Sequence, residues 1–317
     1  MNFQELKENY KRTLKSSDTE ETIDLCFYRP IGYIWALIGR HFGIHPNAIT
    51  IASIFLGVGA GVMFYFNPLW MNIIGMGLLI WANSFDSADG QLARLTGQYS
   101  RIGRILDGLS GDLWFLSIYI AICLREPNTS GFFMTHPWVI WLLAVVAGVS
   151  HIKQAAVADL YRQFHLYFLK GKDGSELESS YQLKRQMAEI PADKFWKRLT
   201  LGFYTGYTLQ QEATTPAMQR FRTTLRKYWP DGNLPEWLRI SFRKRSLPLM
   251  KYTNILTFNW RSIALFAALF ARMPWLYFAF EITVMNIIMI YMIISHERLC
   301  RRLTAEIEQR AKQGNIN

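Results

Sequence analysis

The chain has 317 residues, of which 50% are hydrophobic and only 19% are charged, and its formal net charge is +11 at pH 7. A soluble protein of this size carries about a quarter charged residues, so the composition favours a membrane protein with basic segments facing anionic lipid. The three cysteines are too scattered for a disulfide framework or a zinc site. A secreted soluble domain, a disulfide-rich miniprotein and a coiled coil are excluded, and no nucleic-acid partner is expected. The polar residues 1–22 predict no cleavable signal peptide.

Residues 23–45 mix apolar side chains with Arg29, Arg40 and His41. This pattern predicts an amphipathic helix, which either lies in the membrane interface or packs on the helix bundle. Apolar segments follow, each close to the ~20 residues that a helix needs to cross a bilayer. There are six, at 48–66, 69–85, 103–124, 137–158, 255–271 and 275–295. The predicted fold is an all-α integral membrane protein with six transmembrane helices and an N-terminal interfacial amphipathic helix.

Basic residues are distributed unevenly between the predicted loops. With the N-terminus in the cytoplasm, Arg125 and Arg272 are the only basic residues in the outward loops. Because Lys and Arg concentrate on the cytoplasmic side, both termini are predicted to be cytoplasmic, and the membrane would be the inner one in a bacterium.

The same assignment divides the chain into five segments. They are the cytoplasmic N-terminus and juxtamembrane helix (1–46), the first four spans (47–168), a cytoplasmic insert (169–253), the last two spans (254–299) and a cytoplasmic tail (300–317). The insert ends in a basic cluster of Arg239, Arg243, Lys244 and Arg245, which either contacts anionic headgroups or forms a solvated flank.

Four aspartates lie around the junction of the second and third spans, where residues 86–112 read DSADGQLARLTGQYSRIGRILDGLSGD. Asp86 and Asp89 are three residues apart and share one helix face. The antiparallel return of the chain should bring Asp107 opposite them. Carboxylates at one depth repel each other unless a cation neutralises them, and a set of oxygen ligands without Cys or His favours Mg²⁺ or Mn²⁺ over zinc.

Small residues and one arginine accompany these acids. Gly90, Ala93 and Gly103 would let a ligand or a neighbouring backbone approach closely. Arg94 has the planar guanidinium that suits phosphate oxygens. Metal-bound carboxylates, an arginine and small residues together predict a site for a diphosphate.

This arrangement resembles the signature of the CDP-alcohol phosphotransferases, also called CDP-alcohol phosphatidyltransferases. The matching positions are Asp86, Asp89, Gly90, Ala93, Arg94, Gly103 and Asp107. The stretch HPNAIT at 45–50 is similar to the motif that precedes the family's first span. The resemblance covers residues ~28–160 well, whereas segment 169–253 has no obvious counterpart in the family.

The sequence departs from the family's pattern at the fourth aspartate of the signature. The family has it four residues after the third, where this chain has Gly111, and the acid follows one position later as Asp112. On a regular helix a step of five residues turns the side chain by roughly 140° instead of about 40°. We expect a one-residue bulge, favoured by Gly108 and Gly111, to bring Asp112 into the site. The alternative is that Asp112 points elsewhere.

The resemblance implies both a reaction and a set of roles. A CDP-linked donor would bind through two Mg²⁺ (or Mn²⁺) ions, an alcohol acceptor would attack it, and CMP would leave. The implied metal ligands are Asp86, Asp89, Asp107 and Asp112. The implied donor-binding residues are Asp89, Gly90, Ala93, Arg94 and Gly103. Asp112 would act as general base, with Asp107 as a second catalytic residue, and the family suggests a homodimer.

Three functions remain open from the sequence. The first is transfer of a phosphatidyl group from CDP-diacylglycerol to inositol phosphate, glycerol phosphate or serine. The second is transfer of phosphocholine or phosphoethanolamine from a soluble CDP-alcohol to diacylglycerol or ceramide. The third is a non-enzymatic membrane protein.

Two ionisable residues in the last spans lie outside the motif. Arg261 either binds the acceptor alcohol or extends to the membrane interface. Glu281 is expected to make a structural hydrogen bond, because its predicted position is away from the acidic motif.

Overall fold

A computed structural model describes residues 3–14, 16, 18–129, 131–171, 179–191 and 194–315. These residues form helices, and the described part of the chain contains no strand. The chain divides into two compact units. The first unit comprises Met1–Val149 and Phe258–Ile282, and the second comprises Ser150–Thr257 and Thr283–Asn317.

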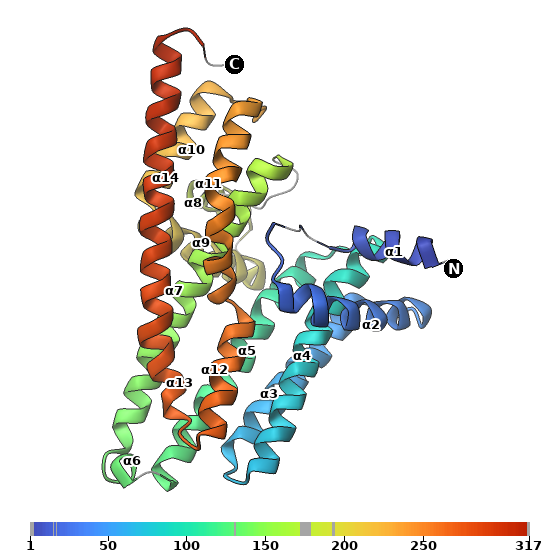
Figure 1. Ribbon diagram of the computed structural model, residues 1–317. Coiled ribbons are helices and arrows are strands. Elements are labelled where there is room, and N and C mark those ends of the chain that lie inside the picture. The colour runs from blue at the N-terminus through green and yellow to red at the C-terminus, as the bar shows by residue number, and fades with distance from the viewer. Residues whose placement is uncertain are drawn as a thin grey trace. The chain divides into compact units, whose positions relative to one another are not determined.

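The first unit is built around α3, α4 and α5, and α3 packs against both of the others (Figure 1). Its helices are α1 (Phe3–Arg12), η1 (Asp24–Tyr28), α2 (Arg29–His41), α3 (Pro46–Tyr65), α4 (Leu69–Thr96), α5 (Arg101–Arg125), η2 (Glu126–Asn128), α6 (Gly131–Thr135), α12 (Phe258–Phe270) and α13 (Trp275–Phe280). The π-helical turn η4 (Glu281–Met285) and the long helix α7 (Pro137–Lys170) continue into the second unit.

Two glycines of α3 explain how closely it approaches α5. A Cβ atom on Gly57 would lie 2.1 Å from the Trp114 ring, and one on Gly61 would lie 2.3 Å from the Ser117 hydroxyl. Since the glycines are four residues apart, they form a groove on one face of α3 into which the side chains of α5 fit. Trp114 belongs to a buried apolar cluster that also contains residues of α4, α7, α12 and α13.

The second unit consists of the rest of α7 together with α8 (Ser180–Glu189), α9 (Phe195–Thr214), α10 (Pro216–Tyr228), α11 (Glu236–Ile255) and α14 (Asn286–Lys312). Aromatic rings form part of its core, and the rings of Phe168 and Phe242 stack with centroids 3.9 Å apart. Glu297 of α14 accepts hydrogen bonds from the backbone N–H groups of Ala217 and Met218 at the start of α10. A carboxylate from a neighbouring helix thus satisfies the first N–H groups of α10.

Arg239 joins α11 to the end of α7. Its guanidinium donates hydrogen bonds to the carbonyl oxygens of Phe168 and Leu169, at 3.0 and 2.8 Å. A cation at the C-terminal end of a helix is stabilised by the helix dipole. Arg239 therefore caps the C-terminal end of α7. The sequence had suggested only a contact with lipid headgroups or a solvated flank for the basic cluster to which Arg239 belongs.

The six predicted spans all coincide with helices: α3, α4, α5, α7, α12, and α13 with α14. Among the described residues, four helices are long and apolar enough to cross a membrane: Pro46–Tyr65, Leu106–Asn128, Pro137–Lys170 and Trp275–Lys312. This supports an integral membrane protein. The count of six spans and the interfacial position of residues 23–45 stay predictions, as does the division into five segments. Residues 23–45 contain α2, which buries Tyr33 and Ala36 and packs on α4.

Candidate metal and diphosphate site

The acidic motif lies at the turn between α4 and α5. Helix α4 ends at Thr96 and is followed by Gly97, whose φ of 70° is the left-handed conformation that stops a helix. Ser100 then begins α5, its hydroxyl accepting a hydrogen bond from the Gly103 N–H at 2.8 Å. This short return brings Asp107 of α5 back beside Asp86 and Asp89 of α4. One carboxylate oxygen of each residue lies within 4.8 Å of the others, which confirms the predicted convergence of these three acids.

Two hydroxyl groups hold the α4 aspartates in place. Thr50 of α3 donates a hydrogen bond to Asp89 Oδ2 at 2.5 Å. The hydroxyl of Ser110 on α5 lies 2.9 Å from Asp86 Oδ1 and 2.8 Å from the Asp107 carbonyl oxygen, and it shares its proton between these two acceptors. Neither residue was predicted from the sequence to belong to the site. Ser110 carried a usable signal, because it follows Asp107 by three positions and therefore shares its helix face. Thr50 belongs to the HPNAIT stretch, but nothing in that pattern pairs it with Asp89.

The three carboxylates differ in exposure, with Asp89 buried, Asp86 half-buried and Asp107 exposed. Burial, together with the neighbouring Asp86 and Asp107, raises the pKa of Asp89 to about 9, and the hydrogen bond from Thr50 only partly opposes this. Such a set of oxygen atoms becomes electrostatically favourable when a divalent cation enters it. Hard oxygen ligands suit Mg²⁺ or Mn²⁺, so the residues fit the predicted metal site.

Arg94 adds an anion-binding group to this site. Its Nε and Nη2 atoms are buried and have no hydrogen-bond partner within the described part of the chain. Its side chain passes over Gly90, because a Cβ atom there would lie 3.4 Å from Arg94 Nη2. These two unpaired guanidinium nitrogens fit a phosphate oxygen, which can accept hydrogen bonds from both of them.

The other small residues of the motif have different surroundings. A Cβ atom on Gly103 would lie 2.5 Å from the Asn47 side-chain oxygen, so this glycine lets the start of α5 approach the start of α3. Ala93 lies half-buried on α4. Contact between helices therefore accounts for Gly103, and its predicted role in shaping the donor site stays a prediction.

The predicted bulge in the third span is wrong. Residues Arg101–Arg125 form one regular α-helix, and an exposed Asp112 is not among the three acids brought within 4.8 Å. The backbone hydrogen bonds of α5 continue through Gly108 and Gly111, because glycines permit a bulge without requiring one. Ser110 occupies the position beside Asp86 on this turn of the helix.

A buried ion pair explains the two ionisable residues of the last predicted spans. Arg261 Nη1 lies 2.5 Å from Glu281 Oε2, and the two side chains are only 2% and 0% exposed. The Tyr277 hydroxyl also donates a hydrogen bond to Glu281 at 2.6 Å. The structural hydrogen bond predicted for Glu281 is confirmed. The extension of Arg261 to the interface is wrong, because its guanidinium is buried in this pair.

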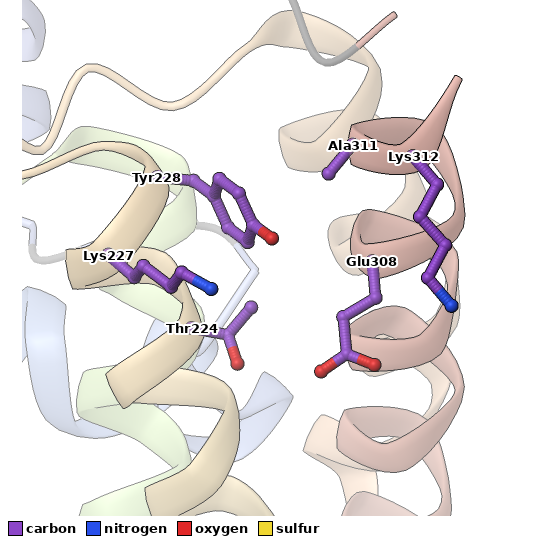
Figure 2. Close-up of a pocket in the computed structure, with 6 residues that line it drawn as sticks. All are labelled: Thr224, Lys227, Tyr228, Glu308, Ala311 and Lys312. Atoms are coloured by element: carbon purple, nitrogen blue, oxygen red, sulfur yellow. The ribbon is translucent and has the colours of Figure 1, made fainter. Parts of the chain in front are cut away.

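A shallow pocket lies elsewhere, between α10 and α14 of the second unit. It is lined by Thr224, Lys227, Tyr228, Glu308, Ala311 and Lys312. Figure 2 shows Lys227 on α10 and Glu308 on α14 on opposite sides of it. This pocket has two lysine amines and one carboxylate in its lining, and none of the predicted site residues lines it.

The helical fold, the apolar helices and the acidic cluster together define a membrane protein with a candidate site for a metal and a phosphate. Residues 43–165 match the family described as CDP-alcohol phosphatidyltransferase, and this match confirms the resemblance seen in the sequence. Members of that family are transferases of substituted phosphate groups.

A curated relative points the same way. The chain is 31% identical over 96 residues to the CDP-diacylglycerol–glycerol-3-phosphate 3-phosphatidyltransferase of Cereibacter sphaeroides. The matched part covers 30% of this chain and 40% of the relative. No solved structure matches the chain.

Proposed function

We propose that this protein transfers a phosphatidyl group from CDP-diacylglycerol to a polar alcohol, releases CMP and depends on Mg²⁺. The proposal rests on the cluster of Asp86, Asp89 and Asp107 together with the unpaired nitrogens of Arg94. The relative's name supports CDP-diacylglycerol as the donor and glycerol 3-phosphate as one acceptor to test, besides inositol phosphate and serine.

The three clustered aspartates would hold the metal, and we propose two Mg²⁺ (or Mn²⁺) ions. When bound, the ions would neutralise negative charge on the diphosphate and on the departing CMP. Thr50 and Ser110 fix the orientation of the Asp89 and Asp86 carboxylates through their hydrogen bonds. The cost of arranging the ligands is then met during folding and not at each turnover.

Arg94 would bind a phosphate oxygen of the donor through its unpaired nitrogens. The acceptor hydroxyl oxygen forms a new bond to the phosphorus of the phosphatidyl group while the bond from that phosphorus to CMP breaks. We assign acceptance of the hydroxyl proton to Asp107, because it is the exposed carboxylate of the cluster. Asp112, the general base predicted from the resemblance, is the alternative that mutation can test.

The membrane setting completes the proposal. With both termini in the cytoplasm, the turn between α4 and α5 faces the cytoplasm, where CMP would be released. Six spans, an inner-membrane location in a bacterium and a homodimer belong to the same proposal.

The direct test is release of CMP by the full-length protein purified in detergent. CDP-diacylglycerol is supplied with glycerol 3-phosphate, inositol phosphate or serine, in Mg²⁺ or in EDTA. We expect release that requires Mg²⁺ and one of these alcohols. Release only from CDP-choline or CDP-ethanolamine, with diacylglycerol or ceramide as acceptor, would replace the proposal with the second function predicted from sequence. No release from any donor would favour the non-enzymatic one.

A further inference from the structure

The buried side of helix α9 is made mainly of polar residues, although Leu201 is also buried at 3% exposed, and several apolar residues of the helix are exposed. Phe195, Leu199 and Leu209 are 61%, 36% and 40% exposed, whereas Thr205 and Gln211 are 4% and 7% exposed. The residues Phe195, Leu199, Gly202, Gly206 and Leu209 are spaced by four, three, four and three positions, so they form one stripe along the helix. A helix bathed in water shows the opposite arrangement.

The buried polar side chains of α9 have partners within the second unit. The hydroxyls of Thr205 and Thr208 donate to carbonyl oxygens one turn earlier in the same helix, at 2.7 and 3.0 Å. Gln211 donates to the carbonyl oxygen of Ala156 on α7 at 2.8 Å. Because these groups are satisfied, α9 keeps its polar side inward and its apolar stripe outward.

The hydrogen bond from Gln211 to Ala156 also places the C-terminal part of α9 beside α7. Helix α7 is one of the helices long and apolar enough to cross a membrane, and its apolar run predicted from sequence ends at residue 158. The C-terminal part of α9 therefore lies beside α7 at the predicted edge of the bilayer. Helix α9 is not itself among the candidate spans found in the described residues.

The charges near the start of α9 are predominantly positive. In the described ranges 179–191 and 194–209, the exposed charged residues are one acid, Glu189, and five bases. The bases are Lys184, Arg185, Lys194, Lys197 and Arg198. Exposed basic residues beside an apolar stripe are complementary to a bilayer that contains anionic lipid.

We propose that α9 lies along the membrane surface. Its apolar stripe faces the lipid, and the basic residues at its start contact anionic headgroups. The predicted cytoplasmic insert then contains a membrane-bound helix. This proposal is independent of the proposed phosphotransfer, because it rests on the exposure of α9 and its contact with α7.

A second copy of the chain is the competing occupant of the stripe. Gly202 and Gly206 are four residues apart, and no atom lies within 4 Å of a Cβ atom added to either. Such spacing allows two helices to pack closely. The five exposed bases disfavour it, since two copies would bring like charges together.

A single fluorescent label tests the proposal in the full-length protein reconstituted in vesicles. Cys26 is exposed and is replaced by Ser, whereas Cys123 and Cys300 are buried. The label is placed on Leu199→Cys. Ile287→Cys, exposed in the last predicted span, serves as the lipid control, and Gln309→Cys, exposed near the end of α14, serves as the aqueous control.

In vesicles containing phosphatidylglycerol, we expect the label at position 199 to be quenched by lipids carrying a spin label, like the label at 287. We also expect it to lose the quenching by aqueous iodide that the label at 309 shows. Iodide quenching equal to that at 309 would overturn the proposal. Oxidative cross-linking between copies at position 199, without quenching from the lipid, would assign the stripe to a second copy.

A charge variant tests the headgroup contact separately. Combining Lys194→Gln, Lys197→Gln and Arg198→Gln should reduce lipid quenching at position 199 in phosphatidylglycerol vesicles. The parent protein should show the same reduction when the vesicles contain phosphatidylcholine alone. Unchanged quenching in both cases would rule out a role for the basic residues.

Discussion

The first unit contains two groups of ionisable side chains that differ in how their charge is balanced. Arg261 and Glu281 form a buried pair of opposite charge, and Tyr277 adds a hydrogen bond. Asp86, Asp89 and Asp107 are three carboxyl groups held close together with the help of two hydroxyl groups, and their ionised forms repel one another. The pair is electrostatically complete, whereas the acids gain stability when a cation binds between them.

This difference separates a structural role from a binding role. A buried ion pair that satisfies itself holds helices together and has no need of a ligand. A cluster of like charges costs folding energy, and it gains a favourable interaction when a metal ion enters. We therefore expect substitutions in the pair to change stability and substitutions in the cluster to change activity.

The largest expected effect is the loss of one partner of the ion pair. Arg261→Met leaves the Glu281 carboxylate buried without its cation, which should cost about 3–5 kcal/mol of stability. Thermal unfolding of the purified protein in detergent measures this cost. The double variant Arg261→Met with Glu281→Leu is the control and should recover most of the loss. A single variant as stable as the parent would show that the pair does not hold the helices together.

Loss of one carboxylate from the acidic cluster should lower activity without lowering stability. Asp86→Asn is expected to lower the rate of CMP release about 10²–10³-fold, the range seen when one preorganised transition-state contact is removed. Its unfolding temperature in EDTA should be no lower than that of the parent, because one of the repelling charges is gone. Asp231→Asn, at an exposed aspartate of the second unit, is the matched control. Release at the parent rate would contradict the assigned site.

Removing the Thr50 hydroxyl, which orients Asp89, should have a smaller effect on activity. Thr50→Val keeps the shape of the side chain and removes a hydrogen bond to a carboxylate, worth about 1.5–3 kcal/mol. The Mg²⁺ concentration for half-maximal activity should therefore rise about 10–100-fold. Thr50→Ser retains the hydroxyl and should remain close to the parent. Equal values for the Val and Ser variants would show that the hydroxyl does not position the metal ligand.

The two groups also differ in how well the sequence predicts them. Asp86 and Asp89 share a helix face by spacing alone, and the short turn through Gly97 and Ser100 returns Asp107 to them. The pairing of Arg261 with Glu281 joins residues on different helices, and it depends on depths that periodicity does not specify. The exposure of the apolar stripe of α9 could not be predicted from the sequence either. A sequence pattern shows that a helix has two faces, but not which face packs inward.

The predicted bulge failed for a related reason. Gly108 and Gly111 permit an irregular turn, but the regular hydrogen bonds of α5 are retained unless a packing contact opposes them. Thr50 and Ser110 were missed because hydroxyl groups are common in helices, and only the tertiary contacts show which of them reach a carboxylate.

The smallest effect on activity is expected for substitution of Asp112, the displaced aspartate. Because α5 is regular, Asp112 is turned by roughly 140° from Asp107 and lies outside the acidic cluster. Asp112→Asn should therefore change the rate of CMP release by no more than about twofold, as for an exposed residue away from the site. Asp107→Asn, measured beside it, should be strongly impaired. Loss of release in both variants would restore Asp112 as the general base.

An aspartate introduced at position 111 complements the Asp112 substitution. Gly111 occupies the position of the family's fourth aspartate, and no atom lies within 4 Å of a Cβ atom added there. Gly111→Asp should therefore fold normally and place a fourth carboxylate four residues after Asp107, on the face of α5 that carries Asp107. We expect this variant to need less Mg²⁺ for half-maximal activity, whereas Gly111→Asn, which fits the same space without the charge, should not. An unchanged Mg²⁺ requirement in the Asp variant would mean that this side of α5 does not reach the metal.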